Sequence, residues 1–186
     1  MANRANVIRY LQRELRVSVL AFDYRGYGRS EGRPHEKGVL ADARAARDWL
    51  ASRAGVAADE IVLMGESIGG AVAVDLAAAD GARGLVLENT FTSLPDVAAY
   101  HFPWLPVRTF MRSRLDSESK IGGYRGPLLQ CHGDADTVVP FALGLRLHEA
   151  AKAPKEFVVI SGGDHNDPRS PQWLTALDEF FDRLSE

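Results

Sequence analysis

The chain has 186 residues, 46% of them hydrophobic, and a formal net charge of −3, which fits one domain with a substantial core and favours no nucleic-acid partner. Its single cysteine, Cys131, excludes an intrachain disulfide, and its place in an apolar run predicts a core thiol. Neither a signal peptide nor a bilayer-spanning segment is visible, so we expect a cytoplasmic protein.

Apolar runs and helical periodicity alternate along the chain. In order, we predict helix 4–15, strand 17–22, helix 39–53, strand 61–64, helix 68–79, strand 84–88, an irregular and partly helical insertion at about 91–126, strand 128–131, helix 141–150, strand 157–160 and helix 172–184. Such alternation predicts an α/β fold with a mostly parallel sheet and helices on both of its faces. We expect residues 1–186 to form one domain, with the insertion as a cap.

The run GESIGG at residues 65–70 lies between a predicted strand and a predicted helix. This context is typical of the GxSxG nucleophile elbow, in which a tight turn holds a serine in a strained conformation above the sheet. We expect Gly65 and Gly69 to be glycine because neighbouring backbone passes too close for a side chain. Ser67 is the predicted nucleophile. The N–H of Ile68, at the positive end of the helix, is the predicted oxyanion donor.

An acid and a histidine follow the serine in two later loops. Asp136 lies in the loop after strand 128–131, and His165 lies in SGGDHNDP after the last predicted strand. The order serine, acid, histidine is that of the α/β-hydrolase fold. His165 would accept the serine proton, and Asp136 would fix the tautomer of the imidazole.

Rival assignments exist at these positions. Asp134 and Glu88 are alternative acids, and an aspartate in a glycine-rich turn often bonds only its own backbone. We interpret His132 as a structural part of the Asp136 turn.

Several stretches together resemble the α/β-hydrolase superfamily over nearly the whole chain. They are VLAFDYRGYGRSEG at 19–32, ADARAARDWL at 41–50, GESIGGAVA at 65–73, LENTFTSLPD at 87–96, HGDADTVVP at 132–140 and GGDHND at 162–167. They are similar to serine hydrolases with a short cap, a subgroup that includes bacterial esterase-like proteins, aminopeptidase-like members and eukaryotic membrane-associated hydrolases. The resemblance implies a serine hydrolase without cofactor or metal, acting on a small-molecule or acyl ester or thioester through an acyl-enzyme.

The start of the chain departs from the family pattern. In the family, the helix resembling residues 4–15 is preceded by a strand and an HG-containing loop, which supplies a second oxyanion N–H. Loss of one such donor costs about a hundredfold to a thousandfold in rate. By the family's sheet order, the strand belongs between residues 17–22 and the strand before Ser67, so its absence leaves a gap of about two strand spacings, roughly 10 Å. Because central strands carry paired backbone groups that cannot be left bare, we expect an N-terminally truncated α/β-hydrolase fold rather than a chain whose strands have closed the gap. We therefore expect these 186 residues alone to be unstable or nearly inactive.

Other interpretations remain open at this point. The substrate could be an amide, as for aminopeptidase-like members, or the incomplete site could bind a small molecule or a partner without turnover. A metal site is a third alternative, built from carboxylates and imidazoles in two loops, namely His132, Asp134, Asp136, Asp164, His165 and Asp167. The sequence does not indicate an oligomeric state.

The insertion is rich in aromatic residues, namely Phe91, Tyr100, Phe102, Trp104, Phe110 and Tyr124. They either line an acyl pocket or pack the cap against the sheet, and we favour packing. Its charged residues are Arg108, Arg112, Arg114 and Lys120 together with Asp116 and Glu118. The mixed signs predict a solvated surface.

Overall fold

The structure is a computed structural model that describes residues 5–152 and 154–185. One parallel sheet holds four strands in the order β1-β2-β3-β4, with β1 at Val62–Glu66, β2 at Gly84–Glu88, β3 at Leu128–Gly133 and β4 at Lys155–Ile160. Every pairing is parallel. This confirms the predicted α/β class.

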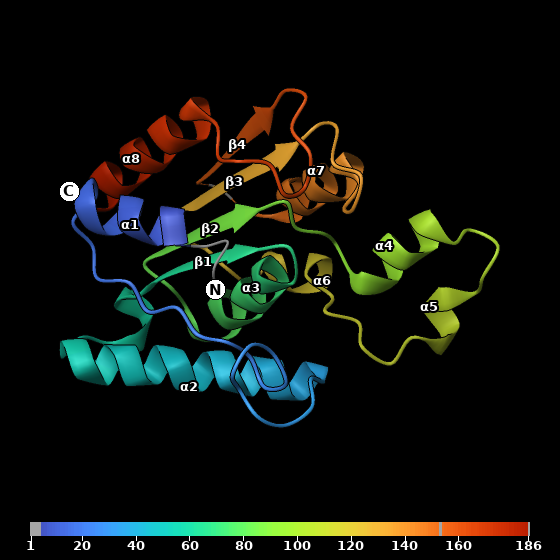
Figure 1. The fold of residues 1–186 in the computed structure, drawn as a ribbon, viewed down its shortest axis with the longest axis horizontal. Helices are drawn as coiled ribbons and strands as arrows, with labels where there is room; N and C mark the ends of the chain where they lie inside the picture. Colours follow the sequence, from blue (N-terminus) through green and yellow to red (C-terminus); the bar gives the residue numbers. More distant parts are fainter. Residues whose placement is uncertain (1–4, 153, 186) are drawn as a thin grey trace.

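Helices connect and cover the strands (Figure 1). They are α1 (Ala5–Arg13), α2 (Glu36–Ala54), α3 (Ile68–Asp80), α4 (Leu94–His101), α5 (Val107–Phe110), α6 (Glu118–Ile121), α7 (Phe141–Ala150) and α8 (Pro171–Ser185), with a 3₁₀ turn at Ala58–Glu60. One core cluster joins α1 and α8 to the sheet, and a second joins α3, α6 and α7 to its other face. Helix α2 packs outside α3. None of these described helices is long and apolar enough to cross a membrane.

The central strand β2 shows why the apolar runs become buried strands. Val86 belongs to the cluster with α1 and α8, whereas Leu85 and Leu87 belong to the cluster with α3. This is the alternation of a pleated strand, whose successive side chains point to opposite faces. All five residues of β2 are buried because both faces are covered, so the strand reads as a continuous apolar run.

Residues 17–22, predicted as a strand, do not form one. A strand needs a hydrogen-bonded neighbour, but this segment and β1 both line a cavity of about 630 Å³ instead of pairing with each other. Side chains such as Val19, Val72 and Leu76 line it, and β1 is one of the two edge strands of the described sheet. The expected gap beside the strand that precedes Ser67 is therefore present among the described residues.

The start of α2 differs from the predicted start for a local reason. Helix α2 begins at Glu36 instead of residue 39, because the His35 side chain caps it by accepting the N–H of Gly38 at 3.1 Å.

The insertion between β2 and β3 contains α4, α5 and α6. Helix α6 contacts α3 and α7, whereas α4 and α5 extend away from the sheet (Figure 1).

Candidate active site

Ser67 occupies the turn between β1 and α3, at the carboxyl end of β1. Its backbone has φ 55° and ψ −123°, a conformation that non-glycine residues rarely adopt. Two bonds hold it there. The Ser67 N–H donates to the Glu88 carbonyl at 2.9 Å, and the Thr90 hydroxyl donates to the Ser67 carbonyl at 2.8 Å. The residues after β2 thus support the turn that projects Ser67.

The two glycines of the motif are not equivalent. A Cβ on Gly65 would overlap the Gly69 carbonyl group, as predicted. A Cβ on Gly69 would meet only the Tyr24 hydroxyl at 3.9 Å, so the expectation that backbone excludes a side chain there is wrong. The close approach is one-sided, because the Gly69 backbone passes over the Cα of Gly65.

This asymmetry predicts opposite results for two alanine substitutions. Gly65→Ala is expected to push α3 away from β1 and lower the free energy of unfolding by about 1–3 kcal/mol, the usual cost of overpacking. Gly69→Ala is expected to leave stability unchanged or raise it by up to about 1 kcal/mol, because alanine favours a helix over glycine. Urea unfolding of both variants measures the difference. Equal losses of stability would contradict the one-sided contact.

Asp136 and His165 meet at the carboxyl ends of β3 and β4. The Nδ1 atom of His165 lies 2.8 Å from Oδ2 of Asp136. The other carboxylate oxygen accepts the N–H groups of Val138 and Val139 at 2.9 and 2.7 Å. Burial alone raises the pKa of Asp136, but the hydrogen bonds from His132, His165 and these two N–H groups outweigh it and hold the pKa well below its usual value. Asp136 is therefore an ionised acceptor.

His132 is a second imidazole against the same carboxylate. Its Nε2 lies 3.3 Å from Oδ2 of Asp136 and 2.9 Å from the Val139 carbonyl oxygen. Both neighbours are acceptors, so Nε2 carries the proton. The other nitrogen, Nδ1, has no hydrogen-bond partner in the described structure, and it packs where a Cβ on Gly144 would overlap it. His132 is thus a hydrogen-bond donor enclosed between Asp136 and α7.

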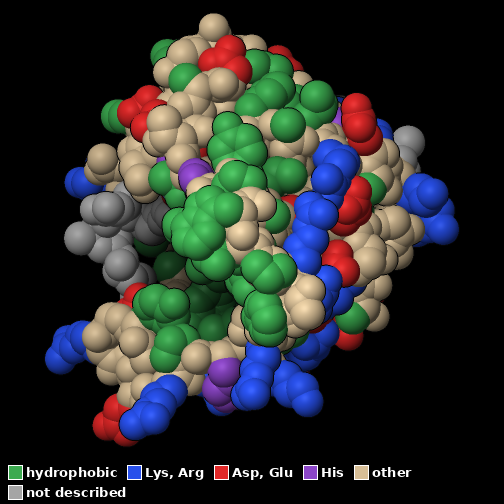
Figure 2. Space-filling model, turned by 90° about the vertical axis from the view of Figure 1, so that its right-hand side faces the viewer, with side chains coloured by type: hydrophobic (Ala, Val, Ile, Leu, Met, Phe, Trp, Pro, Cys, Tyr) green, Lys and Arg blue, Asp and Glu red, His purple; other side chains and the backbone are tan. Residues whose placement is uncertain are grey.

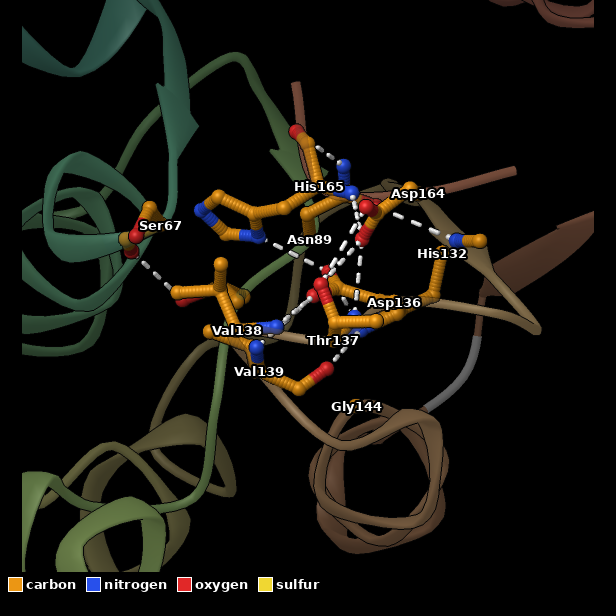
Figure 3. Close-up of polar contacts among 12 residues, drawn as sticks. Ser67, Asn89, His132, Asp136, Thr137, Val138, Val139, Gly144, Asp164 and His165 are labelled. Atoms are coloured by element: carbon orange, nitrogen blue, oxygen red, sulfur yellow. Dashed lines mark hydrogen bonds and ion pairs between the residues drawn. The ribbon is translucent and has the colours of Figure 1, made fainter. Parts of the chain in front are cut away.

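Two residues fasten the loops that carry this pair (Figure 3). The Asn89 side chain donates to the His165 carbonyl at 3.0 Å and accepts the Gly133 N–H at 3.2 Å. The Asp164 carboxylate accepts the His165 N–H at 2.7 Å and the Thr137 N–H at 2.8 Å. Sequence reasoning missed the role of Asn89. Its signal was a polar residue directly after an apolar strand.

The sheet brings the three predicted residues to one edge. In Figure 3 the His165 ring lies between Asp136 and Ser67, with Nδ1 toward Asp136 and its opposite side toward Ser67. Ile68 is the first residue of α3, where the N–H groups of the first turn lack acceptors within the helix. The Ile68 N–H therefore lies in the first turn of α3, and its role as the oxyanion donor stays a prediction.

The rival acids have other partners. Glu88 pairs with Arg169 at 2.9 Å, and the Asp134 carboxylate accepts the Gly162 N–H at 2.6 Å. Cys131 is buried, which raises the pKa of its thiol well above the usual value and confirms the predicted core thiol. Within 5–152 and 154–185, no group of three or more His, Cys, Asp or Glu side chains is arranged to hold a metal ion.

The aromatic residues of the insertion divide into two sets. Phe91 and Tyr124 are buried, at 1% and 5% exposure. The other four are exposed, namely Tyr100, Phe102, Trp104 and Phe110. The expectation that these side chains pack the cap against the sheet is therefore confirmed for two of them and wrong for four.

Residues 2–110, more than half of the chain, match the family described as the alpha/beta hydrolase fold. The chain belongs to this family, as the elbow and the parallel sheet indicated.

Two curated relatives are similar to this chain over most of its length. The chain is 45% identical over 172 residues to an uncharacterized protein of Mycobacterium tuberculosis strain H37Rv, covering 92% of this chain and 61% of the relative. It is 35% identical over 169 residues to human alpha/beta hydrolase domain-containing protein 17B, covering 89% of this chain and 57% of the relative. The chain thus spans roughly three fifths of the length of these relatives.

Solved structures show the same fold. An alpha-beta serine hydrolase homologue from Coxiella burnetii superimposes with a TM-score of 0.62 at 26% identity, covering 87% of this chain and 66% of that one. An esterase from Pyrococcus furiosus superimposes with a TM-score of 0.70 at 21% identity, covering 88% of this chain and 69% of that one. The chain therefore shares the alpha/beta hydrolase fold with these proteins, and an esterase is among its structural neighbours.

Proposed function

We propose that the protein is a serine hydrolase that cleaves a carboxylic ester or thioester through an acyl-enzyme. One observation carries the proposal: Asp136 holds the Nδ1 side of His165 at 2.8 Å, while the other side of the ring is directed toward the elbow at Ser67. A serine hydroxyl is a poor nucleophile at neutral pH, and an imidazole in this position activates it by accepting its proton.

The chemistry assigns one role to each group. The Ser67 hydroxyl oxygen attacks the carbonyl carbon, and His165 takes its proton and passes it to the departing alcohol or thiol. Water then attacks the acyl-enzyme with His165 again as base, which releases the acid and restores Ser67. Asp136 stabilises the imidazolium formed in both halves. The N–H of Ile68 is the proposed donor to the oxyanion.

The related proteins support this choice at the level of reaction class. Named neighbours include an esterase and a serine hydrolase homologue. The proposal includes a small-molecule or acyl substrate and a cytoplasmic location. Activity of the whole protein is part of the proposal too, since the chain spans 61% of the mycobacterial relative.

A fluorophosphonate probe tests the proposal directly, because it reacts with an activated serine even where turnover is slow. The folded chain is expected to be labelled with one probe per molecule, and the same chain unfolded in urea is expected to stay unlabelled. Chelator should not change the result. Absence of labelling in a version of the chain extended by the strand and the HG-containing loop, with a known serine esterase labelled in parallel, would reject an activated serine.

Nitrophenyl esters, acyl thioesters and aminoacyl anilides of matched acyl length then separate the substrate classes. The proposal predicts faster turnover of the ester or thioester than of the anilide. Faster turnover of the anilide would contradict the proposed ester or thioester hydrolase and favour an aminopeptidase-like amide hydrolase.

A further inference from the structure

The segment at residues 100–115, called the arm below, has an unusual composition. It reads YHFPWLPVRTFMRSRL, with three arginines, four aromatic residues of the Phe, Tyr and Trp type, and no acidic residue. The whole chain carries a net charge of −3. The arm is therefore a local cationic and aromatic segment in an acidic protein.

The apolar side chains of the arm are exposed to an unusual degree. Exposure is 75% for Trp104, 76% for Phe110 and 66% for Tyr100, and Phe102 and Leu105 are exposed as well. Single exposed apolar residues are ordinary on a protein surface. Five within eleven consecutive positions form a patch, and such patches mark binding sites. In Figure 2, which faces this end of the molecule, hydrophobic side chains gather at the centre with Lys and Arg side chains along their margin.

The charges beside the patch favour an anionic partner. Arg112 and Arg114 are exposed, and Arg108 is 65% exposed in its side chain. The acid bonded to Arg108 is Asp96, at 2.8 Å, and Asp96 also pairs with Arg146. Arg146 also pairs with Glu118 at 3.0 Å, so two carboxylates balance Arg108 and Arg146. The positive charge at the margin of the patch therefore comes from the exposed Arg112 and Arg114.

We propose that the arm docks on the surface of an anionic lipid bilayer. Trp, Tyr and Phe side chains settle at the boundary between headgroups and acyl chains, and arginines bind the headgroup phosphates. Helices α4 and α5 project from the body of the molecule (Figure 1), so the patch can enter a soft interface without a complementary partner surface. The positive margin selects negatively charged lipid.

The arm contacts the loop that carries Asp136, so docking of the arm would also position the candidate active site relative to the bilayer. The ring of His101, at the end of α4, contacts the Val138 carbonyl oxygen at 2.9 Å, and Val138 follows Asp136 by two residues. Val138 and Ile68 are themselves exposed hydrophobic residues, at 45% and 40%. Docking would bring Ser67 close to the bilayer, which under the proposed function points to a lipid-borne acyl substrate.

Vesicle co-sedimentation tests the docking without any need for activity. The chain is expected to sediment with vesicles of phosphatidylcholine mixed with phosphatidylglycerol, and less with phosphatidylcholine alone. The double variant Trp104→Ala/Phe110→Ala should lower the partition coefficient about tenfold or more, since each lost side chain removes a large apolar contact. The double variant Arg112→Gln/Arg114→Gln should lower it about tenfold on the mixed vesicles alone.

A matched control is available elsewhere on the surface. Trp49 is 58% exposed on α2, near its C-terminal end, which lies across the molecule from α4 and α5 (Figure 1). Trp49→Ala should therefore bind vesicles like the parent chain. All variants should unfold at the same urea concentration, since the replaced side chains lie in solvent.

Three outcomes would overturn the proposal. They are no sedimentation with either vesicle, equal loss for Trp49→Ala, and a concentration-dependent dimer that the Trp104→Ala/Phe110→Ala variant dissolves. The last would assign the patch to a second copy of the chain. Because labelling of Ser67 is measured separately, docking without labelling would reject the proposed function alone.

Discussion

Replacement of Ser67 by alanine is expected to abolish fluorophosphonate labelling and to lower ester turnover by about a thousandfold or more, the scale found when a triad nucleophile is removed. The Ser67 side chain makes no capping hydrogen bond to α3. The substitution therefore removes the attacking oxygen without removing a bond that holds the elbow. Stability should change by less than about 0.5 kcal/mol, because alanine carries a Cβ as serine does and meets the same backbone strain at φ 55°.

A second serine provides the control for this experiment. The Ser30 hydroxyl donates to the Asp23 carbonyl at 2.8 Å in an exposed loop. Ser30→Ala should keep full labelling, measured by mass spectrometry of the intact protein. Labelling that persists in Ser67→Ala would place the reactive nucleophile elsewhere and refute the assignment of the elbow.

Replacement of Asp136 by asparagine is expected to lower turnover by about ten-thousandfold, the loss that follows when a triad acid no longer fixes the histidine tautomer. The Asp136 side chain is fully buried, and its Oδ2 atom lies 2.8 Å from Nδ1 of His165. An amide in its place favours the wrong tautomer and cannot stabilise the imidazolium. The kcat of the variant measures this directly.

The same substitution has a signature in the pH dependence of stability. The pKa of Asp136 is lowered in the folded protein from a reference value of 3.8. A depressed pKa means that the carboxylate contributes stability that is present above the unfolded pKa and is lost as the pH falls from there through the folded pKa. Asp136→Asn should therefore flatten the acid limb of the stability curve. Urea unfolding between neutral pH and pH 3 measures the slope.

Asp134 is the matched control for both measurements. It lies two residues earlier, is exposed and accepts the Gly162 N–H. Asp134→Asn should keep turnover within about threefold, since surface substitutions have small effects. Equal losses for Asp134→Asn and Asp136→Asn would show that the loop as a whole, and not the bond to His165, supports activity.

The residues that could be predicted were those whose signal is local. The elbow has a strand before it and a helix after it within the same window, and β2 is an apolar run with the bounds expected from the sequence. Asp136 and His165 follow strands that end at one edge, so a parallel sheet brings them together without knowledge of the loops.

The residues that could not be predicted depend on neighbours distant in the sequence. Residues 17–22 have the pattern of a strand, but pairing requires a neighbour at hydrogen-bonding distance, and a cavity lies there instead. His132 was predicted as part of the Asp136 turn and lies against Asp136, but the sequence does not show that its ring packs against Gly144 on α7. Asn89 lies 76 positions from His165, and the sequence does not show that its side chain reaches the His165 carbonyl.

The position of β1 has a consequence for how this chain behaves in solution. One side of β1 pairs with β2, and the other adjoins the cavity instead of a further strand among the described residues. The edge of a sheet is a template on which another chain adds a strand, the route by which natural sheets aggregate. The strand that leads into Ser67 is thus one of the two edge strands of the described sheet, with β4 as the other. Self-association along β1 would place a second chain beside the strand that leads into the elbow.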